Sequence, residues 1–289
     1  MTILNFPFVG SEAVARGLVR KHELRARYRA EFPDVYVPKG MPLTIYDRAK
    51  AAWLYSHREG VIAGLTASAL HGAKWVDDEL PIELIWPNAR RPRGLRTYDM
   101  RLCSNEFLEF GEMRITTIQR TAFDVGRRGR LDDAIARLEA LGNATGFKAD
   151  EILVVADAHR GARGIRQLRA ALDLYDPGAA SPKETWLRLL VIRAGYPRPR
   201  TQIPVLSPDG RRWYYLDMGW EDLMLAVEYD GEQHRVDPRQ FAYDIQRSED
   251  LDELGWTRVR VVKENRPADV LRRIERCWSS KLLTDREIS

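Results

Sequence analysis

Hydrophobic and polar positions recur with two different periods along the chain, and the period predicts the type of each element. Residues 11–17 and 18–29 have the spacing of short helices, with Ser11 as the expected N-cap of the first. Residues 32–38 alternate like a strand and end in a Pro-Lys-Gly turn. The first 45 residues are therefore predicted to form two helices and a strand.

The order helix, turn, helix, strand and turn is typical of a winged helix-turn-helix module, here residues 1–45. Any small helical hairpin followed by a strand gives the same order, so both interpretations stay open. Residues 46–175 then alternate between helical and strand periods and predict a small α/β domain. Its expected helices are residues 46–55, 66–72, 119–124 and 131–141, and its expected strands are residues 81–86 and 113–118.

Residues 176–181 form the expected linker, because Pro, Gly and small residues are concentrated there. Beyond it, Ser181, Pro182 and Glu184 predict the capped start of a helix. The following pattern predicts strands at 202–205, 213–218 and 223–229, a helix at 237–254, a strand at 257–262 and a helix at 268–281. We expect residues 181–289 to form a domain with a mixed sheet flanked by helices, which makes the whole chain α/β (α+β).

Composition fits a globular protein, with 44% hydrophobic and 30% charged residues among 289. Residues 181–289 carry 19 basic and 19 acidic residues, so the net charge of +4 arises entirely before residue 181. The two cysteines are far apart and lack metal-ligand spacing, so we expect neither a disulfide scaffold nor a zinc site. The sequence shows no membrane span and no signal peptide, so we expect a cytoplasmic protein without a membrane partner.

Asp217 and Glu228 fall inside otherwise apolar strands, where carboxylates are depleted and costly to bury. Strand alternation places Glu228 on the face opposite Leu225 and Val227, and pairing of the two strands would bring Asp217 beside it. Mg²⁺ or Mn²⁺ prefers such oxygen ligands. The pair is therefore predicted to bind a divalent metal for phosphodiester hydrolysis.

Three further residues have both a catalytic and a structural interpretation. Asp230 precedes a glycine and is also a common turn residue. Glu184 completes a capping box, and His234 could equally be a surface or core histidine. We keep all three as candidate catalytic residues beside Asp217 and Glu228.

The run Glu184, Gln202, Asp217, Glu228-Tyr-Asp-Gly, His234, Asp244, Arg247, Leu251, Gly255 and Arg260 resembles the very-short-patch-repair (Vsr)-like branch of the PD-(D/E)XK nucleases. The resemblance covers residues 181–281. It implies a restriction-endonuclease-like fold, Mg²⁺-dependent DNA cleavage and metal ligation by Asp217 and Glu228. It also implies Glu184 as an auxiliary acid and His234 as a proton-transfer or phosphate-contacting group.

One position departs from that pattern. The superfamily has a lysine two residues after the second acid, whereas this chain has Asp230. His234, Arg247 or Lys263 could supply the missing cation, or the activity is weak.

Residues 8–142 are similar to the AbiEi-like antitoxins of abortive-infection toxin–antitoxin systems. The resemblance rests on the helix pair before Asp34-Val-Tyr-Val37, on Thr66-Ala-Ser-Ala-Leu-His-Gly72 and on Thr117-Ile-Gln-Arg-Thr-Ala-Phe-Asp124. It implies a DNA-binding winged helix followed by a small α/β domain. A toxin or a repair protein is then a candidate partner besides DNA. For His71 and Arg120, packing and hydrogen bonding inside the domain are the expected roles.

Arginines supply the candidate DNA contacts. A Pro- and Gly-containing loop carries Arg90, Arg91 and Arg93, and Arg160, Arg163, Arg166 and Arg169 would form one stripe if their segment is helical. Arg90, Arg91, Arg93, Arg163, Arg166 and Arg247 are the predicted nucleic-acid-binding residues, although solvated arginines would give the same pattern.

The leading hypothesis is a metal-dependent DNA endonuclease or nickase with an N-terminal DNA-recognition module. The alternative is a DNA-binding regulator or antitoxin with an inactive nuclease fold, which Asp230 in place of lysine favours. An RNA-directed nuclease ranks lower, because the sequence has no recognisable module with aromatic stacking residues.

Overall fold

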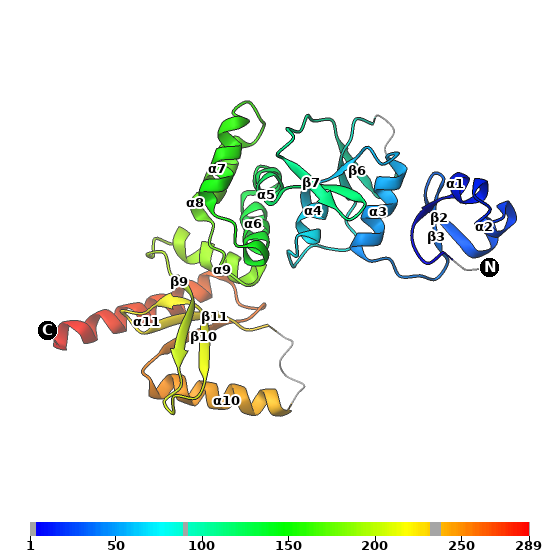
Figure 1. The fold of residues 1–289 in the computed structure, drawn as a ribbon. Coiled ribbons are helices and arrows are strands. Elements are labelled where there is room, and N and C mark those ends of the chain that lie inside the picture. The colour runs from blue at the N-terminus through cyan, green and yellow to red at the C-terminus, as the bar shows by residue number, and fades with distance from the viewer. Residues whose placement is uncertain (1–3, 89–91, 232–237, 289) are drawn as a thin grey trace. The chain divides into compact units, whose positions relative to one another are not determined.

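The chain consists of two compact units, Met1–Tyr175 and Asp176–Ser289, which are described separately. The computed structural model describes residues 4–88, 92–231 and 238–288 (Figure 1). The boundary between the units falls at the start of the Pro- and Gly-containing segment 176–181. We call the two parts the N-terminal unit and the C-terminal unit.

The N-terminal unit begins with a three-stranded antiparallel sheet in the order β1-β3-β2. Its elements are β1 (Phe8–Val9), α1 (Gly10–Ala15), α2 (Lys21–Arg27), β2 (Tyr28–Phe32) and β3 (Val35–Pro38). The expectation of a single strand over residues 32–38 was wrong, because the chain turns back between β2 and β3. Asp34 adopts a left-handed φ of 58° in this turn, a conformation that Asp tolerates better than most residues.

Asp34 also explains why Ser11 is not a helix N-cap. Val9 occupies the N-cap position of α1, and no side chain caps the helix. The Ser11 hydroxyl instead donates to Asp34 Oδ2 over 2.6 Å, and the Ser11 backbone N–H donates to Asp34 Oδ1 over 3.0 Å. The serine therefore fixes the turn to the start of α1.

A five-stranded mixed sheet follows, in the order β6-β5-β4-β8-β7. Its strands and the two helices associated with it are α3 (Ile45–Tyr55), β4 (Val61–Ile62), α4 (Gly64–Leu70), β5 (Ile82–Ile85), β6 (Leu95–Tyr98), β7 (Phe107–Phe110) and β8 (Met113–Thr116). Trp53 of α3 shares one buried cluster with Ile62, Leu84 and Ile115 of the sheet and with Phe32 of β2. The small first sheet and the larger one therefore pack on opposite sides of one core around α3.

Four helices complete the N-terminal unit: α5 (Ile118–Gly126), α6 (Leu131–Thr145), α7 (Ala149–Ala158) and α8 (Ile165–Leu174). The expected arginine stripe does not form, because Arg160 and Arg163 lie in the turn between α7 and α8. Gly164 ends that turn with a φ of 90°, and a Cβ there would lie 2.1 Å from the Arg127 carbonyl oxygen. Arg169 pairs with Asp157 over 2.7 Å.

A buried ionic network joins α5 to its neighbours. Arg120 donates to Glu106 over 2.8 Å and to Asp124 over 2.9 Å, and all three side chains are buried. His159 Nε2 lies 2.6 Å from the same Glu106 oxygen. His71 Nε2 lies 2.8 Å from the Thr116 carbonyl oxygen. His71 and Arg120 thus have the hydrogen-bonding role within their domain that the sequence predicts.

The C-terminal unit has a four-stranded mixed sheet in the order β12-β11-β10-β9. Strand β10 is antiparallel to both β9 and β11, and β12 is parallel to β11. The elements are α9 (Pro182–Arg193), β9 (Arg200–Leu206), β10 (Trp213–Trp220), β11 (Leu225–Tyr229), α10 (Pro238–Glu253), β12 (Thr257–Val261) and α11 (Pro267–Ile288). Their order along the chain is the predicted α-β-β-β-α-β-α.

Helices cover the two faces of this sheet with separate cores. Leu187 of α9 and Ile274 of α11 pack with Val227 of β11. Leu251 of α10 packs on the other face, with Leu216 of β10 in the same cluster. The expected mixed sheet flanked by helices is confirmed at this level, and both units are mixed α/β structures. No helix among the described residues is long and apolar enough to cross a membrane.

Replacement of Arg120 by methionine is expected to destabilise the N-terminal unit by about 3–5 kcal/mol, because it leaves Glu106 and Asp124 buried without their shared cation. Chemical denaturation measures the change. Arg169→Met, which removes only the exposed pair with Asp157, should cost about 1 kcal/mol or less. Equal losses in the two variants would show that the buried network has no special weight.

Candidate functional site

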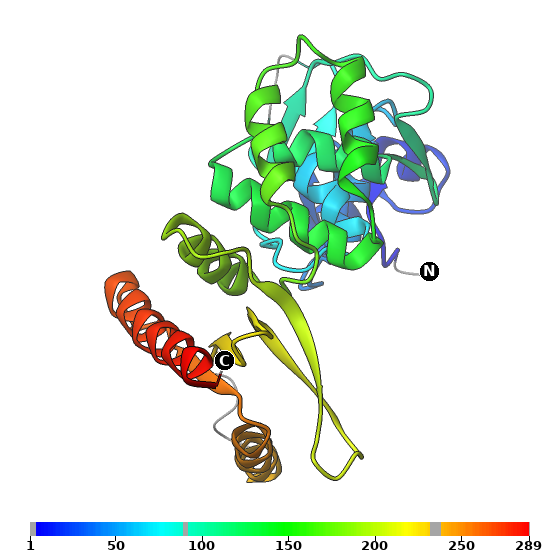
Figure 2. The same ribbon diagram turned by 90° about the vertical axis from the view of Figure 1, so that its left-hand side faces the viewer.

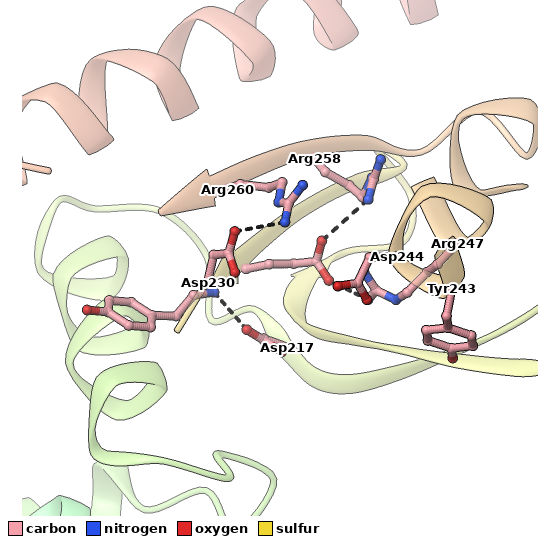
Figure 3. Close-up of a pocket in the computed structure, with 9 residues that line it drawn as sticks. Asp217, Asp230, Tyr243, Asp244, Arg247, Arg258 and Arg260 are labelled. Carbon is pink, nitrogen blue, oxygen red and sulfur yellow. Dashed lines mark hydrogen bonds and ion pairs between the residues drawn. The ribbon is translucent and has the colours of Figure 1, made fainter. Parts of the chain in front are cut away.

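Asp217 lies where the pairing of β10 with β11 ends. The ladder reaches Met218, which lies opposite Val227. Beyond it, Asp217 Oδ2 accepts a hydrogen bond of 2.7 Å from the backbone N–H of Tyr229 (Figure 3). A side-chain carboxylate therefore connects the two strands at this point and is held between them.

A local irregularity of β10 sets the direction of this carboxylate. Leu216 packs in the core under α10, whereas Met218, of the same parity, packs in the core under α9 and α11. On the neighbouring strand β9, Gln202 lies opposite Asp217, between the paired positions, and has a φ of 49°. The alternation of β10 therefore changes face at Asp217, and a regular strand would not have predicted its surroundings.

Glu228 lies on β11 and is 7% exposed, on the face that packs against α10. Arg247 Nη2 of α10 donates to Glu228 Oε1 over 2.5 Å and to the Tyr215 carbonyl oxygen over 2.9 Å. Arg258 Nη1 lies 3.9 Å from Glu228 Oε2. Two guanidinium groups thus offset the cost of burying this carboxylate.

Asp230 pairs with the third arginine of the site. Its Oδ2 accepts a hydrogen bond of 2.8 Å from Arg260 Nη2, and β12 places Arg260 directly opposite Glu228 (Figure 3). The acids and arginines surround one pocket of about 220 Å³. It is lined by Asp217, Glu228, Tyr229, Asp230, Tyr243, Asp244, Arg247, Arg258 and Arg260.

The pKa of Asp217 is raised to about 7. Burial is the largest cause, and the negative charges of Glu184 and Glu228 raise it further. The Tyr229 N–H and the Arg247 guanidinium act in the opposite direction without balancing these effects. Negative charge around Asp217 is therefore in excess, which is the electrostatic condition that a bound cation would relieve.

Glu184 contributes to this charge from the start of α9. Ser181 is the N-cap and Pro182 the first residue of the helix, as predicted. Glu184 accepts from the Ala180 N–H over 2.8 Å and from the Ser181 hydroxyl over 2.9 Å. Burial raises its pKa. Its carboxylate is engaged in capping and does not line the pocket, so it acts on Asp217 only through its charge.

The structure brings together Asp217, Glu228, Asp230 and Arg247 of the predicted site residues. His234, Arg90 and Arg91 lie outside the described residues. The other predicted DNA contacts, Arg93, Arg163 and Arg166, are exposed and belong to the N-terminal unit.

Five pocket residues were missing from the residues predicted for the site: Tyr229, Tyr243, Asp244, Arg258 and Arg260. Alternation gave a usable signal for the two arginines. In the segment Thr257–Val261 they alternate with valines, so they share the face of β12 that continues the Glu228 face of β11. Tyr243 and Asp244 come from α10. The sequence alone did not define which face of the sheet this helix covers.

No protein-family model matches the chain. The chain is 32% identical over 202 residues to the uncharacterized proteins MT2308 and Rv2248 of Mycobacterium tuberculosis, strains CDC 1551 and H37Rv. The alignment covers 69% of this chain and 73% of each relative. The chain therefore belongs to the same family as these two mycobacterial proteins. The crystal structure of the RV2827C protein from M. tuberculosis covers 71% of this chain and 84% of its own, at 12% identity and a TM-score of 0.39.

The raised pKa of Asp217 predicts that the free energy of unfolding depends on pH. Between the unfolded value of 3.8 and about 7, the folded protein keeps a proton that the unfolded chain has released, so this group lowers stability as the pH rises. Asp217→Asn should therefore raise the free energy of unfolding at pH 8 by roughly 2–4 kcal/mol and change it little at pH 4.

Urea denaturation at the two pH values, followed by tryptophan fluorescence, measures this effect. Asp222→Asn, which changes an exposed carboxylate five residues further on, is the matched control and should leave the pH dependence unaltered. A lower stability of Asp217→Asn at pH 8 would contradict the assigned surroundings of Asp217.

Proposed function

We propose that the C-terminal unit is a divalent-metal-dependent DNA endonuclease or nickase with a restriction-endonuclease-like fold. The observation that carries the proposal is the pocket in which Asp217 and Glu228, from neighbouring strands, face three arginines. Such a combination suits phosphodiester hydrolysis, because anionic ligands can hold a metal while cationic side chains hold the phosphate. The topology, with three antiparallel strands, a fourth parallel to the third and helices on both faces, is compatible with that fold.

The donor set fits Mg²⁺ or Mn²⁺. Among the described residues there is no group of three or more His, Cys, Asp or Glu that could hold a metal. Mg²⁺ nevertheless needs only one or two carboxylates, because it keeps waters and binds substrate phosphate oxygens. Asp217 and Glu228 would hold the ion, which when bound would polarise the scissile phosphate and lower the pKa of a water.

Arg247 is the best candidate for the cation that replaces the missing lysine. Asp230 occupies the lysine position, and its carboxylate pairs with Arg260. Arg247 lines the pocket, and its guanidinium contacts Glu228 and the Tyr215 carbonyl oxygen. A planar guanidinium can bind two phosphate oxygens at once, so Arg247 would orient the phosphate once it leaves Glu228. Lys263 does not line the pocket.

The N-terminal part would recognise DNA. The β2–β3 hairpin follows α2 and would serve as the wing of a winged helix, and α2 exposes Lys21, His22, Arg25 and Arg27. Basic residues on one short helix beside a hairpin are suited to contacts with the phosphate backbone. This module supports DNA recognition in both candidate functions.

The second candidate is a DNA-binding regulator or antitoxin whose nuclease fold has lost activity. Asp230 in place of lysine favours it, and so does the ion pairing of Glu228 with Arg247 and Arg258. In this case the arginines would neutralise Glu228 permanently, and a toxin or repair protein could be the partner. The two candidates differ in one property, metal-dependent cleavage.

Cleavage of supercoiled plasmid DNA in Mg²⁺ or Mn²⁺ tests the proposal. Asp217→Asn and Glu228→Gln should each reduce the rate at least about 100-fold, since residues that only support metal ligands already cost 10–100-fold. Asp222→Asn is the control with an exposed carboxylate and should cleave like the wild type. Cleavage that is equal in all four proteins would exclude this site. No cleavage by the wild type, together with specific duplex binding, would favour the regulator.

Arg247 separates a phosphate contact from a structural ion pair. Arg247→Ala is expected to reduce cleavage about 100-fold, and Arg247→Lys should recover part of the loss because it restores a cation. Rates at saturating DNA and folded stability are measured together. A loss of activity that follows only the loss of stability would show that Arg247 does no more than hold Glu228.

A further inference from the structure

The outward face of the β9–β10 hairpin is apolar and exposed. Trp213 lies opposite Leu206, and Tyr215 lies opposite Pro204, so the four side chains adjoin one another on one side of the two strands. Trp213 is 58% exposed, Tyr215 56% and Leu206 40%. The strand β9 is the edge of the sheet, and Figure 2 shows the hairpin as a long ribbon at that edge.

The inward face of the same hairpin already supplies its share of the core. Ile203, Val205, Tyr214 and Leu216 are buried and cluster with Leu251 of α10. In antiparallel sheets with one buried face, the alternate positions are normally polar. In this hairpin the alternate positions carry apolar or aromatic side chains instead. Folding of the unit does not require these side chains, because the inward face already supplies the core. A contiguous apolar patch of this kind marks an interaction surface.

The chemistry of the patch identifies its occupant. Alternate residues of a strand are about 6.8 Å apart and project to the same side, so Trp213 and Tyr215 place two aromatic rings on one side of β10. Positive charge lies beside the rings at the turn of the hairpin. Of the four arginines in residues 198–216, Arg200 pairs with Glu221, whereas Arg211 and Arg212 are exposed and directly precede Trp213. Asp209 is engaged in its own turn with Ser207 and the Arg211 N–H.

We propose that the outward face of the β9–β10 hairpin binds single-stranded DNA, with bases stacked on Trp213 and Tyr215. Aromatic side chains on a sheet bind bases in this way in known single-strand modules, and arginines then track the phosphates. A duplex does not offer its base faces, because its bases are stacked on each other. The patch also has no array of polar groups that would select the ribose 2′-hydroxyl of RNA.

A protein partner fits the patch less well. Strand addition at this edge would meet Pro204, which has no N–H to donate and lies on the edge strand β9. The aliphatic part of the patch is limited to Leu206 and Pro204. An interface between two copies would also bring the arginines of two hairpins together.

The patch is joined to the pocket through β10. The Tyr215 carbonyl oxygen accepts a hydrogen bond from Arg247, and Asp217 follows two residues later. The binding surface does not depend on catalysis by Asp217 and Glu228, so it goes beyond the proposed nuclease function and stands or falls separately.

Fluorescence anisotropy with labelled oligo(dT), in EDTA, measures the binding. Trp213→Ala combined with Tyr215→Ala should weaken it at least about 25-fold, because each stacked base contributes a factor of about 5 or more. Trp213→Phe combined with Tyr215→Phe should stay within about threefold of the wild type, since both rings remain. Trp75→Ala, which removes a tryptophan that is 63% exposed in the N-terminal unit, is the control and should bind normally. Asp222→Asn, which changes an exposed carboxylate outside the patch and the pocket, should also bind oligo(dT) normally.

Four results would overturn the proposal. The first is that the wild type does not bind oligo(dT), or that the double alanine variant binds it as tightly as the wild type does. The second is an equal loss of affinity for duplex and single strand in that variant. The third is binding of oligo(rU) more than about tenfold tighter than oligo(dT), which would assign the surface to RNA. The fourth is that sedimentation shows a dimer for the wild type and a monomer for the double alanine variant, while the two proteins bind oligo(dT) with the same affinity.

Discussion

The cost of placing carboxylates inside a sheet governs the C-terminal unit. Asp217 and Glu228 lie where β10 and β11 stop pairing, and each needs a compensating partner because neither is surrounded by water. Glu228 has Arg247 and Arg258. Among the described residues, the Tyr229 N–H and a more distant Arg247 charge favour the ionised form of Asp217, and its pKa still rises to about 7. The unit thus keeps an uncompensated anionic position beside a cationic pocket, at a cost to its own stability.

Much of this arrangement was contained in local sequence patterns. The order of elements in the C-terminal unit and the cap at Ser181 follow from periodicity and capping patterns, and the pairing of β10 with β11 follows from their succession along the chain. These features depend on neighbours along the chain or on adjacent strands, which a sequence pattern records directly. The structure confirms the mixed α/β fold class that the two resemblances imply. The families and functions that they imply stay predictions.

The rest depends on contacts between distant segments. The arginines of β12 enter the site because β12 pairs in parallel with β11, and the register of that pairing is not written in either segment alone. The change of face at Asp217 needs the left-handed Gln202 on the neighbouring strand. In the N-terminal unit, the segment 32–38 alternates like one strand, yet the chain turns at Asp34. The alternation of hydrophobic and polar residues continues across the turn, so the sequence pattern did not reveal it.

The most direct measurement is the anomalous scattering of Mn²⁺ soaked into crystals of the wild-type protein. The account predicts a peak about 2.0–2.2 Å from carboxylate oxygens of both Asp217 and Glu228, with the Arg247 guanidinium moved away from Glu228. The ion would then relieve the excess negative charge that raises the pKa of Asp217. Crystals that show no peak at these two residues, with Glu228 still paired to Arg247 and Arg258, would contradict a metal site and leave the pocket as a structural ion-pair network.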